Sequence, residues 1–455
     1  MMNIINPATE EIITTVQEDS LAILDLKFRS LQKSAASWSA VPIQKRVEII
    51  EKFVSLLKEN TEELAAILTS EMGKPLQQSR NEINGAGAKA TWLAQHATQY
   101  LSEEIMSVSD QLTEKIVHEP LGIICNISAW NYPYNVGVNI FVPALLAGNA
   151  VMYKPSEYAT LTGIQIGRYL VEAGVPEEVF QVAIGGGSVG KALLDMPFDG
   201  FYFTGSYQTG QKIYQHVANK MVPCVLELGG KDPVYVADDV VDVAGAAAGI
   251  ADGAFYNNGQ SCCSVERIYV QNAIYDEFVR AFVAEVQSWK MGSPTEDGVY
   301  ITVLSRGAQL EVLENQIVDA VAKGAQVIFG GKRVDAKGNY FEPTVLVDVT
   351  NDMLVMREES FGPIIGIMRV KDDVEAVQLM NDTEYGLTAG VYSANQNRAE
   401  AILAQIDAGS GYWNCCDRVS AALPWSGRGN SGFGSTLSQV GLRAFTKPKS
   451  YHLRK

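Results

Sequence analysis

The chain contains 455 residues, of which 47% are hydrophobic and 19% are charged. This composition is typical of a folded globular protein, and the length predicts two or three domains. The net charge of −16 at pH 7 repels nucleic acids and anionic membranes, so we expect neither as a partner.

The cysteines and histidines carry no metal-binding pattern. The six cysteines form no C-x-x-C motif and the four histidines are scattered, so no metal site is predicted and free thiols in a reducing cytoplasm are expected. The N-terminus lacks the basic and apolar regions of a signal peptide. The most apolar stretch, residues 136–152, is too short and too interrupted to cross a bilayer.

The N-terminal third is predicted to be helical. Apolar residues at helical spacing predict one helix over residues 41–72, ended by Gly73-Lys74-Pro75, and a second over residues 77–99. The alternation of apolar and polar residues over 105–117 predicts an exposed hairpin.

From Leu121 onward, short apolar runs alternate with helical stretches, which predicts an α/β fold with a parallel, doubly wound sheet. The predicted strands of this part are GIICNIS, AVMYK, VFQVAI, FDGFYFTG and PCVLELGG. A second α/β pattern follows a predicted boundary near residues 229–231, and its strand candidates are DPVYVA, RIYVQ, QVIFGG, TVLVDV, PIIGIMRV and GLTAGVYS.

Two glycine-containing turns are candidate phosphate sites. Residues 185–190 fit G-x-G-x-x-G, but Asp199 comes too early to be the acidic residue of a dinucleotide fingerprint, and a plain turn explains them at least as well. Gly205, Ser206 and Gly210 also follow a predicted strand and open a helix, whose free N–H groups favour an anion. They are therefore the better candidates.

Cys262 is the candidate nucleophile. A cysteine after Asn-Gly-Gln is expected on a turn or a helix start, where a thiolate is stabilised. A buried, inert cysteine is the ordinary alternative, and by composition Cys263 is an equal candidate. Glu227 and Asn131 favour catalysis, because both end predicted strands and strand ends of one sheet converge on one crevice. Together the three could act as nucleophile, base and oxyanion donor.

Six motifs in chain order resemble those of the aldehyde dehydrogenase superfamily, and the resemblance covers nearly the whole chain. They are W-N-(F/Y)-P at Trp130–Pro133, K-P-S-E at Lys154–Glu157, F-T-G-S-x-x-x-G at Phe203–Gly210, E-L-G-G-K at Glu227–Lys231, F-x-N-x-G-Q-x-C at Phe255–Cys262 and E-E-x-F-G-P at Glu358–Pro363. The pattern selects Cys262 over Cys263 as the nucleophile.

The resemblance implies a Rossmann-type cofactor domain, an α/β catalytic domain and a small β extension for oligomerisation. We assign residues 1–98 and 120–229 to NAD(P) binding, residues 230–429 to catalysis, and residues 99–119 and 430–455 to the extension. The family forms dimers and dimers of dimers, so a homodimer or homotetramer is expected.

The resemblance also implies a mechanism and a cofactor site. Cys262 would form a thiohemiacetal and then a thioester with an aldehyde, Asn131 would hold the oxyanion, and Glu227 would activate water for hydrolysis. The implied cofactor residues are Lys154, Glu157, Trp130, Gly205, Ser206, Glu359 and Phe361. A carboxylate at Glu157 repels a 2′-phosphate, which favours NAD, and NADP stays open because Lys154 would offset that repulsion.

The substrate pocket is predicted from motif position to include Tyr132, Asn135, Ser261, Cys263, Arg418 and Trp425. The short N-terminus resembles succinate-semialdehyde dehydrogenases, but position 139 is asparagine where those usually carry arginine. A broad or medium-chain aldehyde is therefore favoured. Succinate semialdehyde stays open through Arg418, and aminoaldehydes stay open through Asp417 and Trp425.

Three other functions are weighed against this one. A CoA-acylating dehydrogenase normally lacks the glutamate base, so Glu227 argues against it. A non-enzymatic relative tends to lose the nucleophile, and Cys262 is present. A thiol protease or amidase needs a histidine partner, and none of the four histidines lies in a comparable motif.

Overall fold

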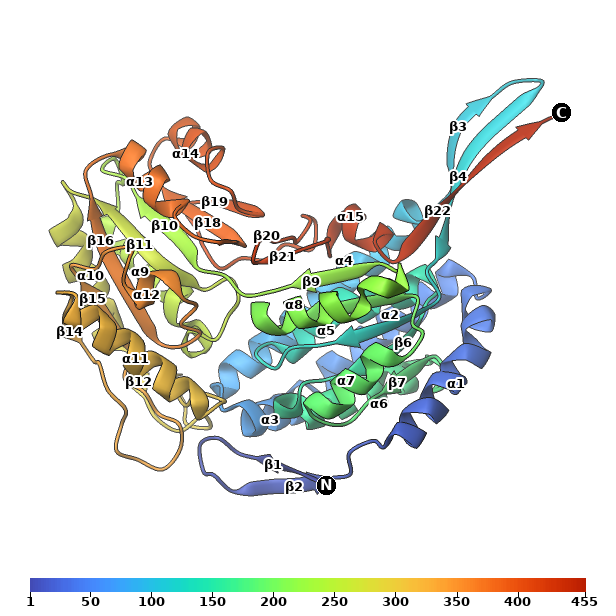
Figure 1. Ribbon diagram of the computed structural model, residues 1–455, viewed down its shortest axis with the longest axis horizontal. Helices are drawn as coiled ribbons and strands as arrows, with labels where there is room; N and C mark the ends of the chain where they lie inside the picture. The colour runs from blue at the N-terminus through green and yellow to red at the C-terminus, as the bar shows by residue number, and fades with distance from the viewer.

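Two sheets form the two lobes of the chain in a computed structural model that describes residues 1–455 (Figure 1). The first has six strands in the order β21-β9-β8-β5-β6-β7, all parallel except β21. Its strands are β5 (Ile123–Ile127), β6 (Ala150–Lys154), β7 (Phe180–Val182), β8 (Gly200–Thr204), β9 (Cys224–Glu227) and β21 (Gly432–Phe433). The strand order reverses on either side of β5, which is the crevice where doubly wound sheets bind ligands.

Helices cover this sheet and share one hydrophobic core with it. Between its strands run α5 (Pro133–Ala147), η1 (Glu157–Ala159), α6 (Thr160–Ala173), α7 (Gly187–Asp195), α8 (Tyr207–Val217) and η2 (Ala218–Lys220). Before them come α1 (Leu21–Ser39), α2 (Ile43–Glu59), α3 (Thr61–Met72) and α4 (Leu76–Tyr100). α4 packs along α5 and α2, which places it directly behind the residues that follow β5.

The second sheet has seven strands in the order β14-β15-β16-β11-β10-β18-β19, and only β14 runs antiparallel to its neighbour. Its strands are β10 (Asp232–Val236), β11 (Val265–Gln271), β14 (Gln326–Phe329), β15 (Thr344–Val347), β16 (Ile364–Val370), β18 (Thr388–Tyr392) and β19 (Ser410–Trp413). The helices of this lobe are α9 (Val243–Phe255), η3 (Tyr256–Gly259), α10 (Tyr275–Ser288), α11 (Ala308–Ala322), α12 (Leu354–Arg357), α13 (Asp373–Met380) and α14 (Gln396–Leu403).

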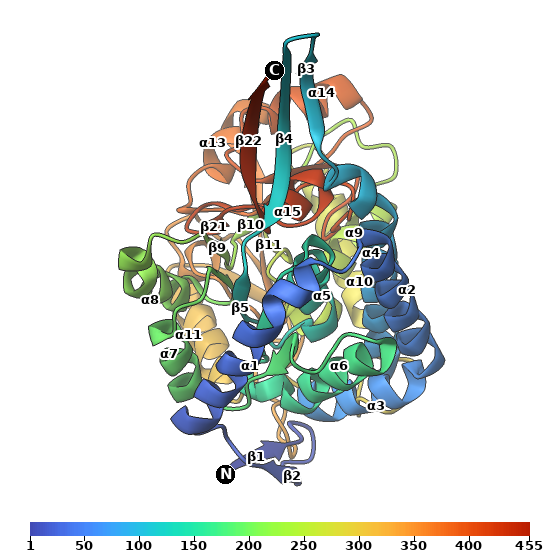
Figure 2. The same cartoon turned by 90° about the vertical axis from the view of Figure 1, so that its right-hand side faces the viewer.

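A three-stranded arm projects away from both lobes (Figure 2). It consists of the hairpin β3 (Glu104–Val108) and β4 (Leu112–Pro120) and the C-terminal β22 (Thr446–Arg454), which pairs antiparallel with β4 over its whole length. The helix α15 (Ser438–Arg443) precedes β22. Small two-stranded sheets are formed by β1 (Met2–Ile5) with β2 (Ile12–Val16), β12 (Lys290–Met291) with β13 (Val299–Ile301), and β17 (Tyr385–Gly386) with β20 (Arg428–Gly429). No helix is long and apolar enough to cross a membrane.

The structure departs from the sequence-based elements at three places. The helix predicted over 41–72 is broken at Asn60, where the side chains of Asn60 and Thr61 bond to the carbonyls of Leu56 and Leu57 and compete with the helix. The helix α1, capped by Ser20, was not predicted. Part of the segment assigned to the extension, β21, pairs instead with β9, because that sheet edge needs a partner next to Glu227.

Candidate active site

Strand register brings the segments of Glu227 and Cys262 together. Glu227 ends β9, and the chain then enters β10, whose Asp232 pairs with Val265 at the start of β11. Cys262 lies in the turn just before Val265. A Cβ on Gly230 would lie 2.9 Å from the carbonyl oxygen of Cys262. The segment that leads into β10 therefore touches the turn that carries Cys262. Only a glycine allows this approach.

The backbone ahead of Cys262 is held in an unusual conformation by buried amides. Asn257 and Asn258 have φ angles of 54° and 56° in the turn η3, a region that asparagine tolerates better than most residues. The side chain of Asn258 donates to the carbonyl of Val303 at 3.0 Å, and the amide of Gln260 donates to the carbonyl of Asn257 at 3.1 Å. The expected turn is therefore present, and its rigidity fixes the position of the thiol.

Asn131 is joined to this turn. Its side-chain nitrogen donates to the carbonyl of Gln260 at 3.1 Å, two residues before Cys262. Its own carbonyl accepts from Lys74 at 2.8 Å and from the Asn257 amide at 3.2 Å. An amide nitrogen has two hydrogens, so one stays free to donate toward an oxyanion beside the thiol.

Lys74 and Glu82 form a buried pair that supports Asn131. Both side chains are fully buried, and their charged atoms lie 2.5 Å apart. The second carboxylate oxygen of Glu82 accepts from the backbone N–H of Tyr134 at 2.9 Å. Because a buried pair is stable only when all its hydrogen bonds are made, this arrangement fixes the start of α5 and the asparagine before it.

Glu227 is buried and held by two hydroxyls. Thr204, its pairing partner on β8, donates to one carboxylate oxygen at 3.3 Å, and Thr436 donates to the other. Burial raises the pKa of Glu227 above its ordinary value, while the two hydroxyls and Lys89 lower it. A carboxylate with a raised pKa is a stronger base than one in water.

Cys262 and Cys263 have different surroundings. Cys262 is partly exposed, whereas Cys263 is buried and donates to Asp417 at 3.0 Å. The hydrogen bond with Cys262 and burial raise the pKa of Cys263 well above its ordinary value. The thiol of Cys263 therefore stays protonated, which fits a packing residue better than a nucleophile.

Asp417 joins the predicted pocket residues Ser261 and Cys263. Its carboxylate accepts from Ser261 at 3.3 Å as well as from Cys263, and burial raises its pKa to about 6. Burial and the charge of Asp417 raise the pKa of Tyr132 well above its ordinary value.

The remaining predicted pocket residues lie in three different surroundings. Asn135, on α5, lies against Gly85 of α4. Trp425 is buried in the same core as Cys263, and its backbone pairs with Thr436, the residue that holds Glu227. Arg418 is exposed, and its guanidinium donates only to the carbonyl of Asp417, at 3.4 Å. No contact places it beside the thiol.

Three predicted cofactor residues, Trp130, Phe361 and Glu359, are linked to one another and to the turn that follows Glu227. The rings of Trp130 and Phe361 meet edge to face with centroids 5.4 Å apart. Glu359 accepts from the N–H of Gly230 at 3.1 Å, and a Cβ on Gly229 would overlap its carboxylate. Burial, with the nearby Glu266, raises the pKa of Glu359 to about 8.

The other predicted cofactor residues lie at the ends of β6 and β8. Lys154 is buried, and its ammonium lies 3.9 Å from the half-exposed carboxylate of Glu157. Gly205 donates its N–H to the carbonyl of Glu227 at 3.0 Å. Ser206 begins α8 without capping it through its side chain, so N–H groups of the first turn are free for an anion.

The other glycine turn, residues 185–190, is occupied by the chain itself. The N–H of Gly186 at the start of α7 donates to the carboxylate of Glu18 at 3.1 Å. An internal carboxylate takes the place that an anion would need, which favours the plain-turn interpretation of this motif.

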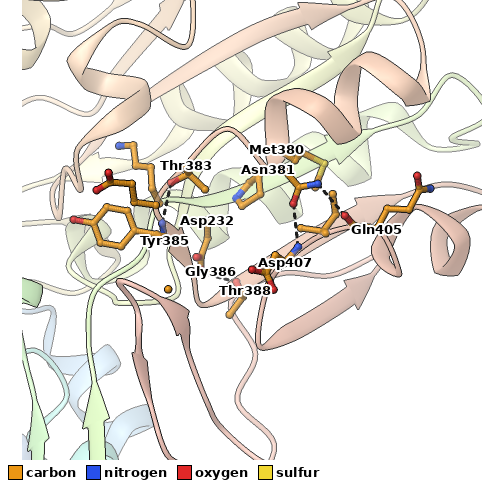
Figure 3. Close-up of a pocket in the computed structure, with 15 residues that line it drawn as sticks. Asp232, Met380, Asn381, Thr383, Tyr385, Gly386, Thr388, Gln405 and Asp407 are labelled. Atoms are coloured by element: carbon orange, nitrogen blue, oxygen red, sulfur yellow. Dashed lines mark hydrogen bonds between the residues drawn. The ribbon is translucent and has the colours of Figure 1, made fainter.

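A cavity of about 350 Å³ lies between the start of β10 and the segments that follow α13 and α14 (Figure 3). It is lined by Lys231, Asp232, Thr388 and residues around 381–386 and 405–408. Its polar groups bond to one another: Asp232 accepts from Thr388 at 2.6 Å, and Asn381 donates to the carbonyl of Gln405 at 2.8 Å. The cavity contains neither the thiol nor Glu227.

A family model described as the aldehyde dehydrogenase family matches residues 1–451. The chain belongs to the aldehyde dehydrogenase family. It is an oxidoreductase that acts on aldehydes and depends on NAD(P), as that family does. The resemblance of the six motifs is thereby confirmed.

Individual aldehyde dehydrogenases match over almost their full length. A betaine aldehyde dehydrogenase of Cereibacter sphaeroides is 33% identical over 451 residues, 99% of this chain and 93% of that protein. A succinate-semialdehyde dehydrogenase [NADP(+)] of Deinococcus radiodurans is 31% identical, covering 98% and 93%. The solved aldehyde dehydrogenase KauB from Pseudomonas aeruginosa superimposes with a TM-score of 0.97 at 31% identity, covering 100% and 93%. The predicted fold class is confirmed.

Several residues of the site were not predicted from the sequence. Thr436 lies more than two hundred residues from Glu227 along the chain, and no local pattern marks it. Lys74 precedes α4, and Glu82 and Lys89 lie on it. In the sequence, only their polarity within an otherwise apolar helix face could have indicated a role.

Proposed function

We propose that this protein oxidises an aldehyde to the carboxylic acid with water as the second substrate. The observation that supports the proposal most is the arrangement of three groups: a thiol on a rigid turn, a buried carboxylate on the adjacent strand end, and an amide tied to that turn. These are the groups that acyl transfer through a thioester requires.

In the first step the Cys262 sulfur bonds to the carbonyl carbon of the aldehyde and the C=O double bond becomes an alkoxide. The proton of the thiol passes to a base, a role that the Glu227 carboxylate can fill. The free hydrogen of the Asn131 amide and the backbone N–H of Cys262 would then donate to the oxyanion.

In the second step the thiohemiacetal loses a hydride and becomes a thioester on Cys262. A bound nicotinamide cofactor supplies the hydride acceptor. Trp130, Phe361 and Glu359 would line its reacting end, and the free N–H groups of α8 would hold its phosphates.

In the third step Glu227 takes a proton from water, and the water oxygen bonds to the thioester carbon. The carbon–sulfur bond then breaks, releasing the acid and returning the thiol. The raised pKa of Glu227 makes it a better proton acceptor, provided that the pH is high enough to ionise it.

NAD is the proposed preferred cofactor. The carboxylate of Glu157 is half exposed beside β6, where it would accept hydrogen bonds from ribose hydroxyls and repel a 2′-phosphate. Lys154 lies 3.9 Å from that carboxylate and is otherwise bound only to the carbonyl of Pro155, so it would reduce the repulsion and leave NADP usable.

The projecting arm supports a homodimer or homotetramer. Its strands expose Ile105, Met106, Val108 and Leu453, and β22 has a free edge nine residues long. A monomeric mass by light scattering would contradict this part of the proposal.

Product analysis tests the proposed reaction. We expect purified protein to form the free acid and NADH from a panel of aldehydes without coenzyme A, with a higher kcat/KM for NAD than for NADP. Formation of an acyl-CoA in strict dependence on coenzyme A would instead assign the CoA-acylating reaction. Absence of NAD(P)H with every aldehyde would contradict the proposal altogether.

Removing the Asn131 amide tests the oxyanion role. We expect Asn131→Ala to lower kcat by about a hundredfold to a thousandfold, the usual effect of losing one such donor. Cofactor affinity should stay unchanged, because the substitution leaves Trp130 and Phe361 in place. An Asn131→Ala enzyme with kcat within threefold of the native protein would exclude the amide from the transition state.

A further inference from the structure

One cation near the thiol has no partner in the protein. Lys89 lies on α4 and is partly buried, yet its ammonium makes no hydrogen bond and no ion pair. Buried charges are normally paired, because leaving one alone costs several kcal/mol in lost hydration. The missing partner is therefore a feature that needs an explanation.

Helix geometry directs Lys89 toward α5. Glu82 and Gly85 lie on the α4 face that contacts α5, through the Tyr134 N–H and the Asn135 side chain. Lys89 follows Gly85 by four residues, so it lies on the same face about 6 Å farther along the helix. The ammonium thus enters the space beside the first turns of α5, which begin directly after Asn131.

The catalytic groups lie within electrostatic range of this ammonium. Burial lowers the pKa of Lys89, and the nearby Cys263, Glu227 and Cys262 act in the opposite direction. Reciprocally, Lys89 lowers the pKa of Glu227. Lys89 is therefore a neighbour of the reacting thiol, although no hydrogen bond connects them.

None of the nearby carboxylates forms an ion pair or a hydrogen bond with Lys89. Glu82 is engaged by Lys74 and by the N–H of Tyr134, and Glu227 by two threonine hydroxyls. Asp417 accepts from Ser261 and Cys263.

Two amides on α5 lie in the same region and are also unpartnered. Asn135 and Asn139 are one helical turn apart, and the side-chain amide oxygen of each is buried without a hydrogen-bond partner in the protein. The side chain of Asn139 is buried, where an unpaired amide costs free energy. A lysine ammonium and two amide groups can together donate to both oxygens of a carboxylate.

We propose that Lys89, with Asn135 and Asn139, binds a carboxylate at the far end of the substrate, so that the enzyme prefers aldehydes that carry an anionic group. Because Lys89 repels cations, aldehydes with an ammonium or quaternary ammonium group are poor substrates. The proposal rests on the proposed function and narrows it, and it replaces the expectation of a broad or medium-chain aldehyde. Lys89 would take the role of the arginine that succinate-semialdehyde dehydrogenases usually carry where this chain has Asn139.

The test compares three aldehydes of similar size: succinate semialdehyde, its neutral methyl ester and betaine aldehyde. We expect the native enzyme to have the highest kcat/KM for the carboxylate and the lowest for the cation. Lys89→Met should lower kcat/KM for succinate semialdehyde by about tenfold to a hundredfold, the factor that a charge-assisted hydrogen bond contributes. Relative to the value for the methyl ester, the value for succinate semialdehyde should fall by this factor and the value for betaine aldehyde should rise.

Two matched variants separate this role from others. Lys89→Arg keeps the charge and should restore most of the preference for the carboxylate, whereas Lys58→Met removes an exposed lysine on α2 and should change nothing. An equal loss for all three aldehydes in Lys89→Met would show that the ammonium acts on the thiol, and would overturn the proposal. So would a native enzyme that prefers the neutral or cationic aldehyde. Failure of the proposed function itself would look different, since no aldehyde would then yield NAD(P)H.

Discussion

Cys262→Ser is expected to lower aldehyde oxidation by at least about a thousandfold, because a hydroxyl is a far weaker nucleophile than a thiolate near neutral pH. Cofactor binding should persist, since Trp130, Phe361 and Glu359, which we propose to line the cofactor site, lie on other segments. The measurements are steady-state NADH formation and the Kd for NADH by fluorescence titration.

Cys263→Ser is the matched control for this substitution. Cys263 is buried and donates to Asp417, and a serine hydroxyl can make the same hydrogen bond. We expect this variant to keep its activity within tenfold of the native enzyme. If Cys263→Ser lost as much activity as Cys262→Ser, or if Cys262→Ser stayed active, the nucleophile would be wrongly assigned.

Glu227→Gln is expected to separate hydride transfer from hydrolysis. Without the carboxylate base, release of the acyl group from Cys262 should slow by about a hundredfold or more, whereas hydride loss from the thiohemiacetal does not need that base. Rapid mixing should therefore show a burst of NADH equal to the number of active sites, followed by a slow steady state. A normal steady-state rate without a burst would remove Glu227 from its role.

The pH dependence of thioester hydrolysis is a second test of the role of Glu227. Burial raises the pKa of Glu227, so in the native enzyme hydrolysis should slow as the pH falls through that raised pKa and the base becomes protonated. Glu227→Gln should lose this acidic limb. Thr436→Val keeps the carboxylate but removes a hydrogen bond that lowers its pKa, and should move the limb to higher pH.

Part of the fold could be read from the sequence because local periodicity determines it. The alternation of apolar runs and helical stretches predicted both parallel sheets, and the strands found at Ile123–Ile127 and Ala150–Lys154 lie within the predicted runs. The break at Asn60 was missed because apolar spacing continues across it, and only side-chain bonds to the preceding carbonyls end the helix there.

The active site, like the fold, could be predicted from the sequence only in part. That Glu227 and Asn131 would lie at one crevice was expected from their places at the ends of predicted strands, since parallel strands end at one edge of a sheet, and Cys262 was expected on a turn. The sequence by itself thus determined which thiol lies on a turn beside a carboxylate, and which superfamily the chain resembles.

Only the tertiary structure decided how these groups are supported. The hydroxyl of Thr436 reaches Glu227 from a distant strand, and the pair of Lys74 and Glu82 fixes Asn131 from another helix. In the sequence Lys89 resembles an ordinary polar residue of a helix, and only packing against α5 places its unpaired ammonium, on a partly buried side chain, near the proposed catalytic groups. Burial and pairing depend on contacts between segments far apart in the chain, and those contacts leave no local pattern in the sequence. For Cys262, local sequence marked the proposed nucleophile, and long-range packing set the charges around it.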